Sequence, residues 1–256
     1  MKIAVDVGNT LIKIHFMNAN QDIGSVSFLC ELKSEDEYYY LIKNQLQIQE
    51  LKIPAGGDLV YSSVVPSVNM NLTLALERLF KPVNTVYLSN KVKTGLPIKC
   101  DNPSEIGNDL LADMVGLKSK YGNASIVVDL GTATKILLLD KDGYFSSAII
   151  MPGLNISMEA LASKGEQLPN VSMIAPKHYV ARNTIDAMNV GVVLGHIEAI
   201  RGIVKGLEKE IGYSCQHVLT GGSALYIKDA LKDEFIYDQH LLRDGLYAIL
   251  EKNLKV

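Results

Sequence analysis

The pattern of apolar and polar positions predicts short strands that alternate with helices. In the first part of the chain, apolar runs separated by turn residues come before a polar stretch with helical spacing. The expected elements there are strands 2–7, 11–17 and 25–30, a helix at about 35–51, strand 59–65, a helix through Phe80 capped by Ser67, and strand 85–88. Strands and helices mixed in this order are typical of an α/β fold.

The second part of the chain repeats this order after a polar loop at 90–101. Asn102, Pro103 and Glu105 have the residue types of a helix start, with Asn102 as the cap. The expected elements are a helix to about Lys120, strands 125–129, 133–140 and 144–151, helix 156–163, an irregular segment 166–178, helix 184–212, strand 217–219, helix 224–231, strand 235–237 and helix 240–252. The loop therefore predicts two lobes, 1–101 and 102–256.

Asp6 and Asp129 belong to two versions of the same phrase. Residues 4–10 read Ala-Val-Asp-Val-Gly-Asn-Thr, and residues 127–135 read Val-Val-Asp-Leu-Gly-Thr-Ala-Thr-Lys. In each, an Asp ends a strand and a Gly and a short polar side chain follow, so the N–H groups of the turn can form an anion-binding nest. A phosphate is the expected ligand, with a cation beside the Asp to separate the negative charges. Two ordinary hairpin turns are the alternative, and the duplication favours the phosphate site.

The composition narrows the possible partners. The 256 residues carry a formal charge of -3 and a pI near 6.0, without the positive field that nucleic-acid binding needs. No apolar run approaches about 18 residues and no charged-then-apolar leader opens the chain, so we expect a cytoplasmic protein that associates with neither membranes nor nucleic acid. Cys30, Cys100 and Cys215 are far apart, which suits free thiols better than disulfides or a metal site.

Asp109 and Asp113 lie four residues apart in a predicted helix and therefore share a face. Like charges at this spacing destabilise a helix slightly, so the pair is either a solvated coincidence or a site for an ion or a proton transfer. Composition alone favours the coincidence. Gly107 costs the helix roughly 1 kcal/mol relative to Ala, which indicates close approach of a ligand or of backbone.

Glycines form two further patterns. Gly191, Gly195, Gly202 and Gly206 mark one stripe of the long predicted helix, where another element can pack closely. Packing within the chain is the commoner cause of such a stripe, and a dimer seam is the alternative. The Thr220-Gly-Gly-Ser turn between a strand and a helix offers room for a flat or phosphorylated ligand beside a positive helix end.

The order of short motifs resembles that of one family. These motifs are Asp6-Val-Gly-Asn-Thr10, Ser62-Ser-Val-Val-Pro66, Thr94-Gly-Leu-Pro-Ile98, Asp101-Asn-Pro103, Glu105-Ile-Gly-x-Asp109, Asp129-Leu-Gly-Thr-Ala-Thr134, Pro152-Gly-Leu154, Leu168-Pro169, Arg182-Asn-Thr184 and Thr220-Gly-Gly222. In these motifs, over nearly its whole length, the chain is similar to type III pantothenate kinases, of the actin, Hsp70 and sugar-kinase superfamily. Each motif alone is weak, but their combination and order are specific. The resemblance implies two duplicated ribonuclease H-like lobes with mixed sheets flanked by helices.

The same resemblance implies an enzyme. Its reaction would be the ATP-dependent phosphorylation of pantothenate to 4′-phosphopantothenate, the first step of coenzyme A biosynthesis. The implied cofactors are ATP, Mg²⁺ and a monovalent cation, either K⁺ or NH₄⁺. Members of the family are homodimers with the active site near the subunit interface, so the expected partners are pantothenate, ATP and a second copy of the chain.

The resemblance also implies roles for individual residues. Asp109 would be the general base, which suits a kinase because its carboxylate positions a hydroxyl and accepts the proton. Asp6 would bind magnesium, and Asp129 would bind the monovalent cation. Thr184 would come from the second chain, unless Arg182-Asn-Thr184 only caps the long helix. The implied ATP contacts are Asp6, Val7, Gly8, Asn9, Thr10, Leu11, Ile12, Lys13, Gly131 and Thr132, and the implied pantothenate contacts are Cys100, Gly107, Asn108, Leu110 and Thr184.

Some positions depart from the family pattern. Leu110 stands in place of an Arg, Asp113 of an Asn, Cys100 of a Tyr, Lys135 of a Thr, and Ser146-Ser-Ala148 of a Gly-Gly pair. An Arg contact to the pantothenate carboxylate contributes roughly 1.5 to 3 kcal/mol, so its loss could weaken binding about tenfold to a hundredfold unless Lys135 or a cation at Asp113 compensates. Two alternatives stay open: a nucleotide-binding relative without turnover and with a regulatory role, and a kinase for another small hydroxyl substrate.

Overall fold

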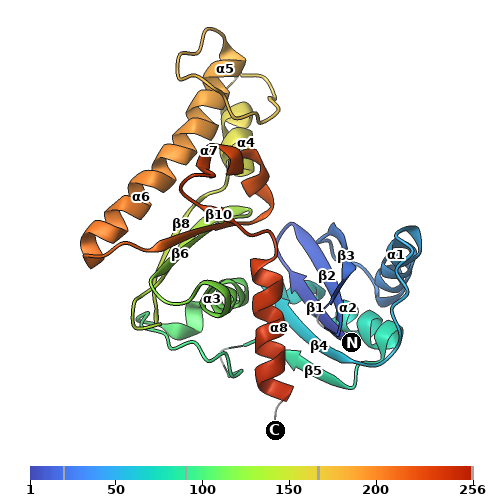
Figure 1. Ribbon diagram of the computed structural model, residues 1–256. Helices are drawn as coiled ribbons and strands as arrows, with labels where there is room; N and C mark the ends of the chain where they lie inside the picture. Colours follow the sequence, from blue (N-terminus) through green and yellow to red (C-terminus); the bar gives the residue numbers. More distant parts are fainter. Residues whose placement is uncertain (20, 90, 166–167, 255–256) are drawn as a thin grey trace. The chain divides into compact units, whose positions relative to one another are not determined.

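The structure is a computed structural model, and it describes residues 1–19, 21–89, 91–165 and 168–254 (Figure 1). The chain divides into two units that are each discontinuous in sequence. Unit 1 comprises Met1–Gly95, Asp101–Ser119 and Leu242–Val256, and unit 2 comprises Leu96–Cys100 and Lys120–Leu241. Each unit contains one five-stranded sheet.

The sheet of unit 1 has the strand order β3-β2-β1-β4-β5. Its first three strands pair antiparallel with their sequence neighbours, whereas β4 and β5 run parallel to β1. Val5 of β1 is buried in one apolar cluster with Tyr38 of α1 and Leu72 of α2, so these two helices cover the sheet. The elements are β1 (Lys2–Val7), β2 (Leu11–Asn18), β3 (Gln21–Leu29), α1 (Glu35–Ile48), β4 (Asp58–Ser63), α2 (Pro66–Phe80), β5 (Asn84–Tyr87), α3 (Asn108–Tyr121) and α8 (Leu241–Leu254).

The sheet of unit 2 has the strand order β10-β9-β6-β7-β8. Here too the first three strands pair antiparallel and the last two run parallel to the first. The elements are β6 (Ser125–Leu130), β7 (Ala133–Leu139), β8 (Phe145–Pro152), α4 (Leu154–Lys164), α5 (Thr184–Asn189), a π-helical segment (Val190–Leu194), α6 (Gly195–Ile211), β9 (Gln216–Thr220), α7 (Lys228–Leu231) and β10 (Ile236–Tyr237). The same pairing occurs in both units, which confirms the predicted duplication of a mixed-sheet lobe.

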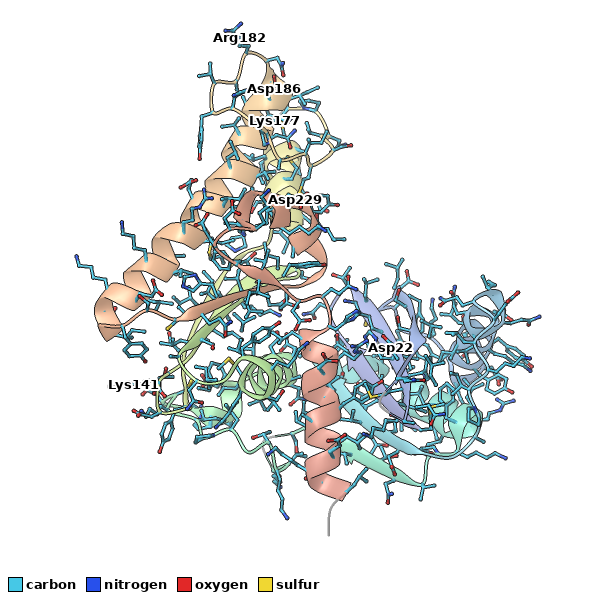
Figure 2. All side chains as sticks on the ribbon, in the orientation of Figure 1. Asp22, Lys141, Lys177, Arg182, Asp186 and Asp229 are labelled. Carbon is cyan, nitrogen blue, oxygen red and sulfur yellow. The ribbon has the colours of Figure 1, made fainter. Side chains whose placement is uncertain are left out.

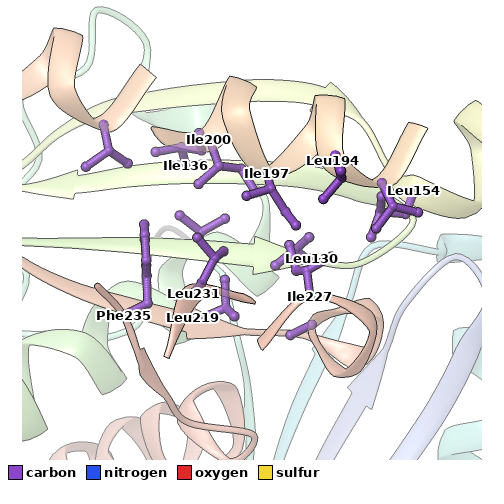
Figure 3. Close-up of a cluster of buried hydrophobic side chains, with 14 of the residues drawn as sticks. Leu130, Ile136, Leu154, Leu194, Ile197, Ile200, Leu219, Ile227, Leu231 and Phe235 are labelled. Carbon is purple, nitrogen blue, oxygen red and sulfur yellow. The ribbon is translucent and has the colours of Figure 1, made fainter. Parts of the chain in front are cut away.

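Helix α6 supplies much of the core of unit 2. Ile197 and Ile200 of α6 pack with Leu130 and Ile136 of the sheet, while Ile227 lies in the same cluster (Figure 3). Side chains alternate between the two faces of a strand. The residues between these core positions, Asp129 among them, therefore face the other side of the sheet.

Two predicted helix starts are wrong in detail. The second helix begins at Pro66, and its preceding residue, Val65, makes no side-chain capping bond, so Ser67 is not the cap. The helix expected from Asn102 is interrupted: Asn102 caps only a 3-10 turn, Pro103–Glu105. Ile106 then adopts an extended backbone, with φ −72° and ψ 121°, and α3 starts afresh at Asn108.

Helices α3 and α8 are far apart in sequence and pack closely in unit 1. A Cβ on Gly245 of α8 would lie 1.9 Å from the carbonyl oxygen of Ala112 and 2.9 Å from the amide nitrogen of Gly116. Only a glycine allows backbone to approach backbone at this distance. Periodicity along the sequence does not indicate such a contact between distant helices. The division of the chain into lobes 1–101 and 102–256 stays a prediction.

At three of its four glycines, the stripe of the long helix packs against none of the described residues, contrary to expectation. A Cβ added to Gly191, Gly202 or Gly206 would meet no described atom within 4 Å. Over Thr184–Ile211 this helix is long and apolar enough to cross a membrane, by length and composition only, and half of its most apolar window is buried in unit 2. The segment expected to be irregular is so over 168–178, while Glu166 and Gln167 lie outside the described residues, as does Asn90 of the predicted loop.

Candidate active site

The first duplicated turn joins β1 to β2. Asp6 lies opposite Lys13 in the antiparallel pair and opposite Ser62 of β4 on its other side. The Gly8 N–H donates to the carbonyl oxygen of Leu11 at 3.0 Å, so it closes the turn instead of pointing towards a ligand. Asn9 and Thr10, together with Leu11, are exposed at its tip, whereas Val7 and Ile12 are buried behind it and Lys13 is half-buried. The polar tip of the turn is therefore the part that can reach a phosphate.

The second turn, between β6 and β7, has the same design. The Gly131 N–H donates to the carbonyl oxygen of Ala133 at 3.1 Å, and Thr132 is exposed. Asp129 lies opposite Lys135 and opposite Thr220 of β9. The Nζ atom of Lys135 donates to Asp129 Oδ2 at 2.7 Å, and the exposed fractions of the two side chains are 16% and 10%. This nearly buried ion pair is a feature that motif analysis missed.

Two later glycines pack against the second turn. A Cβ on Gly153, just after β8, would lie 2.3 Å from the carbonyl oxygen of Thr132. A Cβ on Gly221, which has φ +94°, would lie 2.5 Å from Asp129 Oδ1 and equally close to the carbonyl oxygen of Leu130. Two glycine motifs that are distant in sequence thus converge on one turn in unit 2. Close packing against this turn leaves no space for a Cβ at either glycine.

Asp109 stands in the first turn of α3. Its Oδ1 accepts the N–H of Leu110 at 2.9 Å and folds over Gly107, where a Cβ would lie 2.5 Å from that oxygen. The side chain of Asn108 donates to the carbonyl oxygen of Ser63 at 3.1 Å. Since Ser63 pairs with Val7 at the end of β1, unit 1 brings the start of α3 to the same sheet edge as the first turn.

Two departures from the family pattern lie on the buried side of α3. Leu110 is only 9% exposed, and Asp113 is completely buried. The interpretation of Asp109 and Asp113 as a solvated pair is therefore wrong for Asp113. The spacing of the two carboxylates does not predict the burial of Asp113, because the sequence does not tell which face of the helix points into the protein. Asp109 itself is half-buried.

The remaining predicted contacts, Thr184 and Cys100, lie in unit 2. Thr184 is the first residue of α5 and is exposed, and Asn183 before it accepts the N–H of Asp186 at 2.8 Å. Asn183 therefore caps the helix, as one of the two alternatives predicted. Figure 2 shows the charged side chains of Arg182 and Asp186 on either side of this start. Cys100 is half-buried and not disulfide-bonded.

Comparison with known proteins shows the family of this chain. The family model described as type III pantothenate kinase matches residues 2–206. A type III pantothenate kinase of Acidobacterium capsulatum is 34% identical over 250 residues, which cover 95% of this chain and 91% of the relative. That of Bacillus cytotoxicus is 33% identical over 261 residues, with 99% and 97% covered. The chain belongs to the type III pantothenate kinase family.

Solved structures with low sequence identity share the fold of this chain. A Campylobacter jejuni protein, described as a conserved candidate transcriptional activator of the Baf family, has a TM-score of 0.60 at 18% identity and covers 99% of this chain and all of its own. MreB 5 of Spiroplasma citri, solved with AMPPNP, has a TM-score of 0.51 at 10% identity, with 99% and 96% covered. These likenesses concern the fold alone, and they confirm the actin, Hsp70 and sugar-kinase architecture.

Within the type III pantothenate kinase motifs, the structure groups the predicted residues by unit. Unit 1 holds the first turn and the start of α3, linked through Ser63. Unit 2 holds the second turn with Gly153 and Gly221 packed on it. The signal that could have found Lys135 is hairpin register, because the residue opposite the strand-end Asp follows from the length of the turn. Ser63 lies in the motif Ser62-Ser-Val-Val-Pro66, but nothing in the sequence indicated that its carbonyl oxygen accepts a hydrogen bond from Asn108.

Proposed function

We propose that this chain transfers the γ-phosphoryl group of ATP to the primary hydroxyl of pantothenate, giving 4′-phosphopantothenate and ADP in the first step of coenzyme A biosynthesis. The observation that carries this function is the match to type III pantothenate kinases along nearly the full chain. Both glycine turns and Asp109 lie within residues 2–206, the range that the family model matches. We expect the reaction in the cytoplasm, without nucleic acid or a membrane as partner.

Asp109 is the residue we assign to proton removal. The substrate oxygen forms a bond to the γ-phosphorus, the bond from that phosphorus to the bridging oxygen of ADP breaks, and the hydroxyl proton passes to the Asp109 carboxylate. The Leu110 N–H bonded to Oδ1 holds the carboxylate in one orientation at the start of α3. A fixed orientation is useful because general-base catalysis depends on hydrogen-bond distance to the reacting hydroxyl.

Magnesium fits the chemistry of the first turn. Among the described residues, no group of three or more His, Cys, Asp or Glu side chains could hold a metal by itself. Kinases commonly bind Mg²⁺ through one or two carboxylates together with substrate phosphates and water. The half-buried Asp6 can supply such a carboxylate next to the exposed Asn9 and Thr10. Magnesium would enter with ATP and neutralise charge on its phosphates.

The two turns and the start of α3 supply the other proposed contacts. Residues 6–13 would hold ATP phosphates, while Gly131 and Thr132 would contact ATP in unit 2. Gly107, Asn108, Leu110 and Cys100 would contact pantothenate, and Thr184 would come from the second copy of the chain. Because Leu110 is buried and apolar, it gives the pantothenate carboxylate no charged partner. We therefore expect a high KM for pantothenate.

The direct test is ATP consumption with and without pantothenate, with the product identified by its mass. Formation of 4′-phosphopantothenate establishes the kinase and shows that Leu110 and Cys100 are tolerated. Nucleotide binding without turnover supports the regulatory alternative. Turnover only with another acceptor, found by screening small alcohols that lack a carboxylate, supports the third interpretation.

We propose that the family's homodimer forms here through the open face of α4 and α6. A hollow of about 440 Å³ lies on this face of unit 2, and its lining includes Ala160 and Leu161 of α4 and Gly191 and Gly195 of the long helix. Leu161 is 41% exposed. An apolar hollow beside a bare glycine stripe allows a helix of a second copy to approach closely.

The dimer is tested by light scattering after size exclusion. Leu161→Glu places a charge on the proposed face, so the variant should be a monomer at concentrations where the native chain is a dimer. Leu32→Glu is the matched control because Leu32 is 71% exposed in unit 1. A Leu161→Glu variant that remains dimeric would place the seam elsewhere.

A further inference from the structure

The ion pair of Asp129 and Lys135 disagrees with the expected monovalent cation. Asp129 is the residue to which the family resemblance assigns K⁺ or NH₄⁺, and Lys135 stands where the family has a Thr. In this chain Asp129 Oδ2 accepts a hydrogen bond from the Lys135 ammonium at 2.7 Å. We propose that the Lys135 ammonium is a built-in cation that replaces the free monovalent cation, so nucleotide binding here requires neither K⁺ nor NH₄⁺.

The position of Lys135 is set by the sheet. Asp129 and Lys135 are directly opposite each other in the antiparallel β6–β7 pair, which brings their side chains to the same face. The neighbouring opposite pair, Val128 and Ile136, points into the apolar core beneath α6. A slip of one residue would place the ammonium in that core. The register therefore holds Lys135 beside Asp129.

The negative charge of Asp129 must be balanced because its side chain is buried. Asp129 is only 7% exposed, and a buried carboxylate needs a partner of opposite charge. One ammonium supplies one positive charge, the same as one K⁺ ion. A further monovalent cation at this carboxylate would lie near the ammonium and be repelled by it, with little water to screen the two charges.

Packing limits the other side of the carboxylate as well. Gly221 lies against Oδ1, so closely that a Cβ there would be 2.5 Å from the oxygen. The same glycine lies beside the carbonyl oxygen of Leu130. The carboxylate is thus held between the ammonium on one oxygen and backbone at the other. This arrangement fits a fixed internal charge better than an exchangeable ion.

The inference rests on the proposed function only in that the second turn binds ATP. Its test uses the apparent melting temperature and the affinity for Mg²⁺-ADP by calorimetry, both measured without pantothenate. Buffers contain either tetramethylammonium or K⁺ as the monovalent cation at constant ionic strength, because surface charges also respond to salt. Neither readout depends on phosphoryl transfer.

The native chain should bind Mg²⁺-ADP equally well in both buffers. Lys135→Thr restores the family's residue and removes the charge, so its affinity should be about tenfold weaker in tetramethylammonium and should recover in K⁺ or NH₄⁺. Its melting temperature should rise with K⁺ in the same way. Lys135→Arg keeps the charge and should remain independent of K⁺, and Lys141→Thr is a control for loss of a lysine elsewhere in unit 2.

Two results would overturn the inference. One is a native chain whose nucleotide affinity or melting temperature rises specifically with K⁺, which can be seen without any variant. The other is a folded Lys135→Thr protein that responds to K⁺ no more than the native chain. If no phosphopantothenate forms but these cation responses hold, the proposed function fails and the role of Lys135 stands.

Discussion

Gly245 of α8 lies against the carbonyl oxygen of Ala112 in α3, with no space for a side chain between them. A Cβ at Gly245 would be 1.9 Å from that oxygen. Helix α8 thus packs directly against α3, the helix whose first turn contains Asp109. Gly245, near the end of the sequence, therefore helps to hold α3 and its Asp109 in position through backbone packing.

Gly245→Ala should lower the free energy of unfolding by about 1–3 kcal/mol, because overpacking forces helices apart. Urea unfolding followed by circular dichroism measures the change. Asn44→Ala is the matched control, since Asn44 is exposed on α1 of the same unit. That variant should be neutral or more stable by up to about 1 kcal/mol, as Ala favours helix. Equal stability of the two variants would contradict the close contact.

Gly221→Ala should weaken ATP binding about tenfold, roughly 1.4 kcal/mol, by displacing Asp129 and the end of β6. The backbone of Gly221 has φ +94°, which strains any residue with a Cβ, and the added atom would lie 2.5 Å from Asp129 Oδ1. Calorimetric titration with Mg²⁺-ATP measures the affinity. Gly222→Ala is the control because its Cβ meets no described atom within 4 Å. If both variants bind ATP like the native chain, the second turn is not coupled to the nucleotide.

The architecture could be predicted because each strand and each glycine turn has a local signal. Asp6 and Asp129 each end an apolar run before a Gly, and that repetition was sufficient to predict duplicated lobes. Helix boundaries were less predictable. Glu105 and Asn102 form a helix start locally, yet the chain extends again at Ile106 because tertiary position overrides the local preference.

Contacts between distant segments could not be predicted. The burial of Asp113 depends on which face of α3 points inward, and the contact of Gly245 with Ala112 depends on a crossing of two helices. The ion pair of Asp129 and Lys135 could have been predicted in part from the sequence, because the register of the hairpin places Lys135 opposite Asp129. Sequence patterns identify candidate residues, but packing decides which of their partners lie within reach.

Asp109→Asn should reduce kcat about a hundredfold to ten-thousandfold while leaving the KM for Mg²⁺-ATP nearly unchanged. An amide keeps the size of the side chain but is a poor proton acceptor. Steady-state ADP release at saturating pantothenate gives both constants. Asp233→Asn, at an exposed position of unit 2, should have native kinetics. Native turnover in Asp109→Asn would exclude Asp109 as the general base.

Asp6→Asn should weaken Mg²⁺-ATP binding by about tenfold, because a neutral amide is a poor ligand for magnesium. Binding of ATP in the presence of a chelator should change much less, since that state has no metal to lose. Calorimetry in magnesium and in chelator separates the two effects. An equal loss in both conditions would mean that Asp6 supports the turn instead of the metal.

His196 should make unit 2 less stable below about pH 6.5. Burial lowers the pKa of this histidine from 6.5, and its Nε2 lies 2.8 Å from Thr134 Oγ1 in the core of the unit. Above pH 6.5 the side chain is neutral in both states. As the pH falls below this value, the unfolded chain binds a proton that the folded chain resists, so the free energy of unfolding decreases by at most about 1.4 kcal/mol per pH unit.

Urea unfolding at pH 7.5, 6.5 and 5.5, each roughly one unit apart, measures this slope at a fixed protein concentration. His196→Gln can keep a hydrogen bond to Thr134 but has no proton to gain. The difference in slope between this variant and the native chain isolates the histidine from the carboxylates that titrate lower. A native chain and a His196→Gln variant with parallel pH profiles would show that the buried imidazole is protonated as readily as an exposed one.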